Sequence, residues 1–214
     1  IKVGPSESMS KSKRNTIDPE EMVNNFGADS VRLFILSDSP PEKDVQWSDE
    51  GMLSSYKFVQ KLWILNQKIL DQIKIAQTEE DNDELKKITT KFIQDVENNI
   101  NNFSYNKIIA NFYEIYSKLN KIIEKKISKE SWITNYKNVL IAMSPVIPHF
   151  SHECLEMLKV DGKILWPKID ENVLVEENAN IVIQINGKTR DIITAKKNIS
   201  EKELLLEINK DLRI

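Results

Sequence analysis

The feature that most constrains the fold is a long middle stretch, about residues 45–158, in which apolar residues recur every three or four positions. Glycine and proline, which interrupt helices, are almost absent from it until Pro145. This spacing places side chains on one face of a helix, and such a face has to pack against another. We therefore predict a mainly α fold built on an antiparallel helical bundle, with Pro148 opening a fifth helix. The four predicted stripes are Met52, Tyr56, Val59, Trp63, Leu70 and Ile73; Leu85, Ile88, Phe92, Val96 and Ile100; Ile108, Phe112, Ile115, Leu119 and Ile122; and Trp132, Tyr136, Val139, Leu140 and Met143.

Two short helices are predicted before the bundle. Asp18 can cap the first, with Pro19 at its first position, Glu21 at the capping-box position and Gly27 able to adopt the left-handed conformation that ends a helix. The second is expected over residues 28–36. We expect its inward residues to be Val31, Phe34 and Ile35, with Arg32 at the surface.

After about residue 159 the pattern alternates as in a strand. Ile181, Ile183 and Ile185 are expected on one face, and Asn186-Gly187 matches the preferred two-residue hairpin turn. The return strand would run over 188–194, and Ser200 with Glu203 forms a capping box that opens a last helix. A hairpin and one helix bury too little apolar surface to stand alone, so we expect a small, truncated α+β unit.

Composition narrows the possible classes of protein. A hydrophobic fraction of 40% with 29% charged residues indicates a folded globular chain, and no apolar run approaches the roughly 18–20 residues of a membrane span. One cysteine, Cys154, excludes a disulfide framework and fits a reducing compartment, so we expect a cytoplasmic protein without a membrane partner. The net charge of −3 lacks the positive excess typical of nucleic-acid-binding domains, so any RNA contact must come from local patches.

The segment just before the first helix carries hydroxyls and fixed positive charge: Ser8-Met9-Ser10-Lys11-Ser12-Lys13-Arg14-Asn15. Such a loop can close over a polyphosphate, since backbone and hydroxyl donors bind the oxygens while a lysine offsets developing charge. A solvated basic loop, or a short nuclear-localisation-like run, explains the same residues, and charge alone favours this second interpretation.

Further specific segments follow the loop in order along the chain. They are Ile17-Asp18-Pro19, Phe26-Gly27-Ala28-Asp29-Ser30-Val31-Arg32-Leu33-Phe34, Ser37-Asp38-Ser39-Pro40, Val45-Gln46-Trp47, Phe58-Val59-Gln60-Lys61-Leu62-Trp63, Ser144-Pro145, Pro148-His149-Phe150 and Ile183-Gln184-Ile185-Asn186-Gly187-Lys188-Thr189-Arg190. With the loop they resemble the class I aminoacyl-tRNA synthetases of the branched-aliphatic group, whose signature is Lys-Met-Ser-Lys-Ser followed by Gly-Ala-Asp-x-x-Arg. The late segment makes the resemblance strongest to the leucyl-tRNA synthetase family.

The resemblance implies an ATP-dependent activation of leucine and its transfer to tRNA. Lys11 matches the second signature lysine, which in the family stabilises the triphosphate electrostatically during adenylation, and is the expected catalytic residue. Met9 would anchor the signature loop, and Ser10 and Ser12 would shape it. Ser8 stands where the family has its first lysine, so one ATP-facing charge is missing. The ATP-contacting residues are thus expected to be Ser8, Met9, Ser10, Lys11 and Ser12.

The resemblance also implies three domains and their partners. Residues 1–45 would be the end of the catalytic core, 46–165 a helical tRNA-binding bundle of the anticodon-binding type, and 166–214 a linker with the front part of a domain that reaches the tRNA elbow. The partners would be leucine tRNA, with ATP, Mg²⁺ and leucine bound through a catalytic domain absent from this chain; no DNA partner is expected, and the protein would be a monomer that binds no metal of its own here. This chain alone is expected to be inactive. The expected tRNA contacts are Arg14, Lys188 and Arg190, whereas Lys118, Lys121, Lys125 and Lys126 are better explained as a solvated helix face.

Several alternatives stay open at this stage. His149, His152 and Cys154 lie close enough in sequence for a metal, although helix packing near Pro148 explains them better. A non-catalytic RNA-binding or scaffolding module is a second function, and a valyl-, isoleucyl- or methionyl-tRNA synthetase a third. The four tryptophans are predicted to be core anchors rather than base-stacking platforms: Trp47, Trp63, Trp132 and Trp166.

Overall fold

The structure is a computed structural model that describes residues 7–37, 39–75, 82–159, 164–174, 178–185, 188–196 and 199–208. The chain divides into two compact units, Ile1–Asp170 and Glu171–Ile214. The first unit is helical, and the second contains an antiparallel hairpin and a helix. The predicted mainly α fold class is confirmed.

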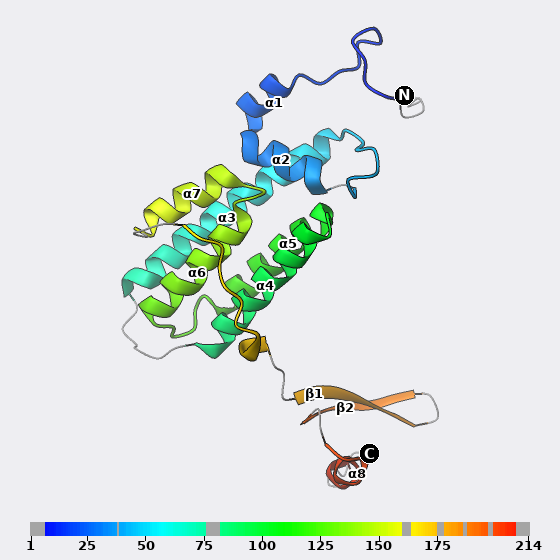
Figure 1. The fold of residues 1–214 in the computed structure, drawn as a ribbon, viewed down its shortest axis with the longest axis vertical. Coiled ribbons are helices and arrows are strands. Elements are labelled where there is room, and N and C mark those ends of the chain that lie inside the picture. Colours follow the sequence, from blue (N-terminus) through cyan, green and yellow to red (C-terminus); the bar gives the residue numbers. More distant parts are fainter. Residues whose placement is uncertain are drawn as a thin grey trace. The chain divides into compact units, whose positions relative to one another are not determined.

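Five helices build the bundle of the first unit (Figure 1). They are α3 (Asp49–Ile75), α4 (Asp83–Asn101), α5 (Tyr105–Ile122), α6 (Lys129–Met143) and α7 (Pro148–Met157). Helix α4 packs against both α5 and α6, and α7 packs against α6 and α3. The predicted fifth helix does begin at Pro148, because proline fits the first helical position, where its missing N–H is not needed.

Two of the bundle helices, α4 and α6, begin where a polar side chain replaces a missing backbone hydrogen bond. Asn82 accepts a bond from the Leu85 amide (2.7 Å) at the start of α4, and Ser128 accepts one from the Ser131 amide (3.1 Å) at the start of α6. Phe103, in the left-handed conformation at φ 52°, reverses the chain between α4 and α5. Local sequence therefore fixes most of the helix boundaries.

The core is aliphatic and aromatic, and Trp132 is its largest fully buried side chain among the described residues. Trp132 and Phe112 are fully buried, and Phe92 packs 5.9 Å from Phe112, centroid to centroid. The other tryptophans differ from the prediction. Trp63 and Trp166 are each 38% exposed, and Trp47 is half-buried at the edge of Phe34, so only Trp132 is a core anchor.

The predicted stripe of α3 is wrong in its middle. The predicted residues Tyr56, Val59 and Trp63 lie beside the buried face, where Phe58 instead stacks on Tyr113 at 3.8 Å. Aromatic and β-branched residues occur on more than one side of this helix, so apolar spacing alone did not select the correct face. The buried residues are Met52, Ser55, Phe58, Leu62, Leu65, Asn66, Ile69 and Ile73.

Two short helices, α1 (Pro19–Phe26) and α2 (Ala28–Ser37), precede the bundle. Asp18 caps α1 by accepting from the Glu20 amide at 2.9 Å, and Gly27 ends it at φ 80°. Both features were predicted; the Glu21 side chain, however, makes no return bond within the described part of the chain. Helix α1 has no buried residue; it packs against α2, and its Phe26 lies 5.7 Å from Tyr56 of α3, centroid to centroid.

The face of α2 that packs on the bundle differs from the predicted one. Ile35 is 48% exposed rather than inward. Arg32 is exposed as predicted, and it also donates hydrogen bonds to the connection between α6 and α7. The reason is that a polar contact through Asp29, described below, sets the rotation of the helix. The buried residues are Asp29, Ser30, Leu33 and Phe34.

The second unit has a 3₁₀ turn, η1 (Glu171–Leu174), strands β1 (Asn178–Ile185) and β2 (Lys188–Lys196), and helix α8 (Glu201–Ile208). The strands pair antiparallel, as predicted, and the Asn186-Gly187 turn lies outside the described residues. Ser200 and Glu203 form the predicted capping box: the Ser200 hydroxyl donates to the Glu203 carboxylate at 2.7 Å, and the Glu203 amide donates back to that hydroxyl at 3.4 Å.

Candidate functional site

The loop before α1 is held together by short-range hydrogen bonds. The Ser10 amide donates to the Asn15 side-chain oxygen at 2.8 Å, and the Asn15 side-chain nitrogen donates to the Ser8 carbonyl at 3.3 Å. The Ser10 and Ser12 hydroxyls lie 3.2 Å apart. Asn15 thus closes a tight loop around Lys11. Sequence reasoning assigned no role to Asn15, although asparagine commonly bonds to nearby backbone in turns.

Cations of this loop differ in their availability. Lys13 is paired with Glu7 at 2.8 Å, whereas Lys11 and Arg14 are exposed and have no ion-pair partner among the described residues. Arg14 has a left-handed backbone at φ 52°, and its amide donates to the Lys11 carbonyl at 3.2 Å. A free ammonium at the tip of a hydroxyl-lined loop can offset the charge of a phosphate group.

The other residues predicted for this loop are placed as follows. Met9 is 47% exposed, and its anchoring role stays a prediction. Ser8 is exposed, and its backbone carbonyl accepts the hydrogen bond from the Asn15 side chain. The loop is therefore built by backbone and amide contacts, and Lys11 supplies its unpaired charge.

A second polar cluster lies where α2 meets the start of α7. Asp29 is only 7% exposed, and its carboxylate accepts bonds from the amides of His149 (3.3 Å) and Phe150 (2.6 Å). It also lies 3.0 Å from the His149 ring nitrogen Nδ1. The residue before α7, Ile147, has no side chain able to cap, so Asp29 of α2 caps α7 from a distant part of the chain.

Arg32 completes this cluster one helical turn later. Its Nε donates to the Val146 carbonyl at 2.9 Å, and its Nη2 donates to the Pro145 carbonyl at 2.7 Å. The two α2 residues therefore hold both the end of the α6–α7 connection and the start of α7. We refer to Asp29, Arg32 and residues 145–150 as the joint; Figure 1 shows α2 beside α7 at this end of the bundle.

The possible metal ligands of the sequence do not form a site. Among the described residues no group of three or more His, Cys, Asp or Glu side chains is placed to hold a metal ion. His149 faces Asp29, and Cys154 is buried in the bundle. Burial, with the charge of Glu153, raises the pKa of the Cys154 thiol to about 12. At neutral pH it is therefore a thiol rather than the thiolate that binds metals.

The bundle carries unpaired positive charge on α3. Lys57, Lys61 and Lys68 are exposed, have no ion-pair partner among the described residues, and stand on one side of the helix at spacings of four and seven. No Asp or Glu occurs between Gly51 and Leu70. We call these three lysines the α3 basic face. Their spacing, and the absence of Asp and Glu around them, could have predicted this face from the sequence.

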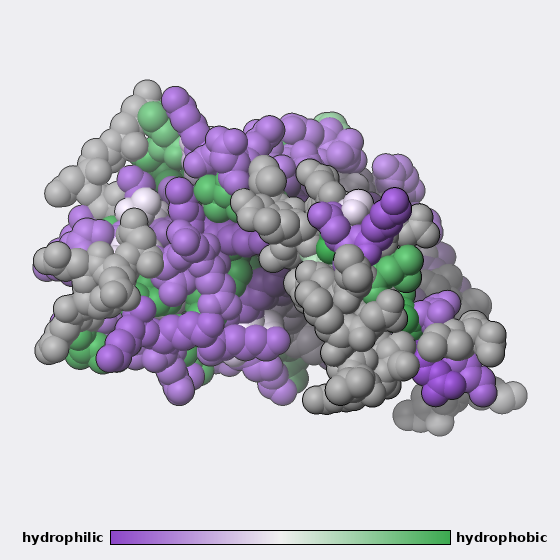
Figure 2. Space-filling model, turned by 90° about the horizontal axis from the view of Figure 1, so that it is seen from below, coloured by the Kyte–Doolittle hydropathy of each residue, from purple (hydrophilic) through white to green (hydrophobic). Residues whose placement is uncertain are grey.

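The lysines considered from sequence are less available. Lys118 pairs with Glu114 at 2.6 Å, and Lys125 pairs with Glu84, whereas Lys121 and Lys126 are exposed. Hydrophilic residues cover most of the described surface on the face drawn in Figure 2. The paired lysines thus behave as the predicted solvated face.

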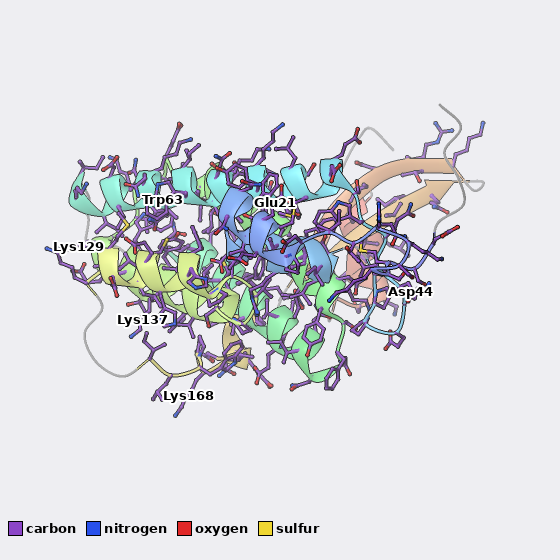
Figure 3. The ribbon with its side chains drawn as sticks, turned by 90° about the horizontal axis from the view of Figure 1, so that it is seen from above. Glu21, Asp44, Trp63, Lys129, Lys137 and Lys168 are labelled. Atoms are coloured by element: carbon purple, nitrogen blue, oxygen red, sulfur yellow. The ribbon has the colours of Figure 1, made fainter. Side chains whose placement is uncertain are left out.

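A polar pocket of about 340 Å³ lies at the start of α4 and α6, against residues 164–170. Lys168 lines it, and Figure 3 shows Lys129, Lys137 and Lys168 on the α6 side of the bundle, with Trp63 on α3. Three distant segments form this pocket, so no local sequence pattern indicated it. Its remaining lining residues are Asn82, Asp83, Lys86, Thr90, Glu130, Ser131, Thr134, Asn135, Asn138 and Asp170.

The hairpin of the second unit presents the two other predicted RNA contacts. Lys188 and Arg190 are both exposed on β2. The strand register shifts between Ile183 and Gln184: Ile183 pairs with Asp191 and Gln184 with Thr189, so Arg190 is the extra residue of a β-bulge. A bulge changes the direction of a side chain relative to its strand, which lets Arg190 project independently of its neighbours.

Comparison with protein families places these features in context. Residues 82–205 match the family described as the anticodon-binding domain of tRNA ligase, which is more than half of the chain. The chain belongs to this family. A second match covers residues 4–48, which resemble the class I tRNA synthetases for isoleucine, leucine, methionine and valine. The loop and the Asp29–Arg32 turn lie in the second match, and residues 145–150 lie in the first.

Curated relatives agree with the resemblance to the leucyl family. The chain is 35% identical over 217 residues to a leucine–tRNA ligase of Afipia carboxidovorans and 37% identical over 207 residues to one of Cereibacter sphaeroides, in each case over 95% of this chain. It spans 25% and 23% of those proteins. The predicted resemblance to the leucyl enzymes is confirmed, and the chain corresponds to their C-terminal region.

A solved structure shares the fold. The chain matches a leucyl-tRNA synthetase of Agrobacterium radiobacter, crystallised in a ternary complex with tRNA and LeuAMS, with a TM-score of 0.80 and 24% identity over 96% of this chain and 28% of that one. At this identity the match supports the architecture of the anticodon-binding region.

Proposed function

We propose that the protein carrying these residues is a leucine–tRNA ligase, and that this chain supplies its ATP-contacting loop and its tRNA-binding domains. The observation that carries the proposal is a loop with an unpaired Lys11, tied through α2 to a bundle of the anticodon-binding family. The identity to leucine–tRNA ligases supports leucine as the amino acid.

The proposed reaction has two steps. The leucine carboxylate attacks the α-phosphorus of ATP, the bond to the pyrophosphate breaks, and leucyl-adenylate and pyrophosphate form. A 3′-terminal ribose hydroxyl of the tRNA then attacks the adenylate carbonyl and releases AMP. Mg²⁺ accompanies ATP in such phosphoryl-transfer steps. Lys11 offsets charge on the departing pyrophosphate, while Ser8, Met9, Ser10 and Ser12 form the loop that carries it.

The RNA would bind through phosphate contacts. Several exposed cations have no ion-pair partner among the described residues: the α3 basic face, Arg14, Lys188 and Arg190. Cations in this state release counterions from RNA on binding, which makes affinity depend on salt. The protein would be a cytoplasmic monomer with three parts in this chain. The end of the catalytic core would be residues 1–45, the tRNA-binding bundle 46–165, and the part that binds the tRNA elbow 166–214. Of the described helices, none is long and apolar enough to cross a membrane.

The proposal is tested by aminoacylation with the complete protein. We expect charging of tRNA with leucine and much weaker charging with valine or isoleucine. Preferred charging with another amino acid would assign the protein to a sister synthetase and contradict the proposal. The 214-residue chain alone, lacking the nucleotide-binding core, is expected to show no leucine-dependent ATP–pyrophosphate exchange. Measurable exchange by this chain would contradict its assigned role.

A further inference from the structure

The joint connects the two segments that match different families. Asp29 and Arg32 belong to the stretch that matches the class I synthetases, and Pro145, His149 and Phe150 belong to the anticodon-binding stretch. Between them run five hydrogen bonds across 113 to 121 residues of sequence. The joint is therefore a polar contact between the part that carries the loop and the part that belongs to the RNA-binding family.

The joint fixes direction as well as distance. Asp29 uses both carboxylate oxygens, one toward the His149 amide and one toward the Phe150 amide, and Arg32 uses two nitrogens of its planar fork for two successive carbonyls. Paired bonds of this kind restrict rotation, which a single apolar contact does not. The carboxylate is buried, so an altered angle would leave either the carboxylate or the α7 amides unsatisfied, which is costly.

Apolar packing alone also attaches α2 to the bundle. Leu33 of α2 is fully buried and Phe34 is 4% exposed, and α2 packs against α3 and α5. Non-directional contacts of this kind hold α2 on the bundle but leave its angle adjustable. Removal of the polar bonds should thus keep the segments together and release their orientation.

We propose that Asp29 and Arg32 are positioning residues that keep the RNA-binding bundle in one orientation relative to the loop-bearing segment, so that a bound tRNA reaches the adenylate. This inference rests on the proposed function and deepens it. Activation of leucine by ATP uses no tRNA, so it does not depend on where the bundle points. Transfer to tRNA does depend on it, and a misplacement of about 1 Å can cost about 100-fold in rate.

The test compares the two half-reactions in the complete protein. For Asp29→Ala and Arg32→Ala we expect kcat/KM for tRNA aminoacylation to fall at least about tenfold, while leucine-dependent ATP–pyrophosphate exchange without tRNA stays within about twofold. Arg32→Lys, which keeps the charge but loses the planar fork, should fall in the same direction. Asp71→Ala, which removes an exposed partner of Lys74, is the matched control and should change neither rate.

Loss of both half-reactions in equal proportion would overturn the inference, and so would unchanged aminoacylation. Asp29→Asn keeps the size of the side chain and converts one accepting oxygen to a donor, so it tests the same contact should Asp29→Ala fail to fold. The same split between half-reactions is expected for it.

A readout without activity separates this inference from the proposed function. In the 214-residue chain, Asp29→Asn should raise hydrogen exchange of the His149 and Phe150 amides at least about fivefold, with the α4 and α5 amides unchanged. Unchanged exchange at both amides would overturn the joint. If the wild-type protein activates no leucine, only the proposed function is contradicted. The hydrogen-exchange result does not depend on leucine activation and still tests the joint.

Discussion

The loop around Lys11 and the joint around Asp29 are both polar, yet they are held in opposite ways. Every side-chain bond of the loop joins residues at most seven positions apart, and its residues are mostly exposed. The joint links residues more than a hundred positions apart, and its carboxylate is buried. Local contacts can break and reform around a ligand, whereas a buried long-range contact resists change. The molecule thus combines an adaptable charged loop with a fixed support.

The difference also concerns free charge. Lys11 has no ion-pair partner among the described residues, so its charge is available to a phosphate, while Asp29 and Arg32 of the joint are already hydrogen-bonded to backbone groups of the bundle. A residue that acts on a ligand should be unpaired before the ligand arrives, and a residue that supports the fold should not. Four predictions follow this contrast from the folded core outward.

The largest effect is expected in the core of the bundle. Trp132→Ala should lower the free energy of unfolding by about 3–5 kcal/mol, because it removes a fully buried indole and leaves a cavity. Denaturant unfolding of the 214-residue chain measures this. Trp63→Ala is the matched control: with 38% of the residue exposed, its loss should cost clearly less. Equal losses for the two would contradict the assignment of Trp132, and not Trp63, as a core anchor.

The next effect is expected in the loop. Lys11→Ala in the complete protein should lower leucine-dependent ATP–pyrophosphate exchange by about 100- to 1,000-fold, because one preorganised charge near the transferring phosphates is lost. The unfolding transition should not move, since Lys11 supports nothing in the fold. Lys13→Ala removes a lysine that is already paired with Glu7 and should have little effect. A larger loss from Lys13→Ala than from Lys11→Ala would reverse the assigned roles.

A smaller effect is expected from the side chain that closes the loop. Asn15→Ala removes two exposed hydrogen bonds. At about 0.5 kcal/mol each, the lower end of the usual range, their loss should raise the KM for ATP in ATP–pyrophosphate exchange about fivefold. The rate at saturating ATP should change less, because Lys11 remains. If Asn15→Ala matches the loss from Lys11→Ala, then loop closure rather than the lysine charge would dominate, and the contrast drawn above would fail.

The smallest effect is a pH dependence in the second unit. Hydrogen bonds from Ser200 lower the pKa of Glu203 below its ordinary value of 4.5. A lowered pKa stabilises the folded helix above the ordinary value, and this stabilisation is lost as pH falls through the lowered pKa. The start of α8 should therefore fray in acid, as seen from the Ser200 and Glu203 amide resonances. Glu203→Gln should remove this pH dependence, and a transition above pH 4.5 would contradict it.

Sequence predicted well the features that depend on neighbouring residues. The caps at Asp18 and Ser200, the start of α7 at Pro148 and the antiparallel hairpin are all short-range, because turn and cap chemistry is decided within a few positions. The hydrogen bonds of the loop around Lys11 are short-range in the same way.

Features that depend on distant residues were missed. Arg32 is exposed as predicted, but its hydrogen bonds and the exposure of Ile35 were not predicted, because nothing near them in sequence indicates the Pro145 and Val146 carbonyls that Arg32 binds. Trp63 was expected inside for a related reason, since α3 has apolar residues on several sides and only its neighbours decide which side is buried. The joint could not be found without the fold.

The central claim, that this chain binds tRNA through local cationic patches, is tested most directly by titrating the 214-residue chain with leucine tRNA at increasing salt. We predict binding at low salt that weakens linearly on a log–log plot, and a slope reduced by about 2–3 when Lys57, Lys61 and Lys68 are all replaced by alanine. Replacement of the paired Lys118 and Lys125 should reduce it less. Absence of binding at low salt, or binding that salt does not weaken, would contradict the account.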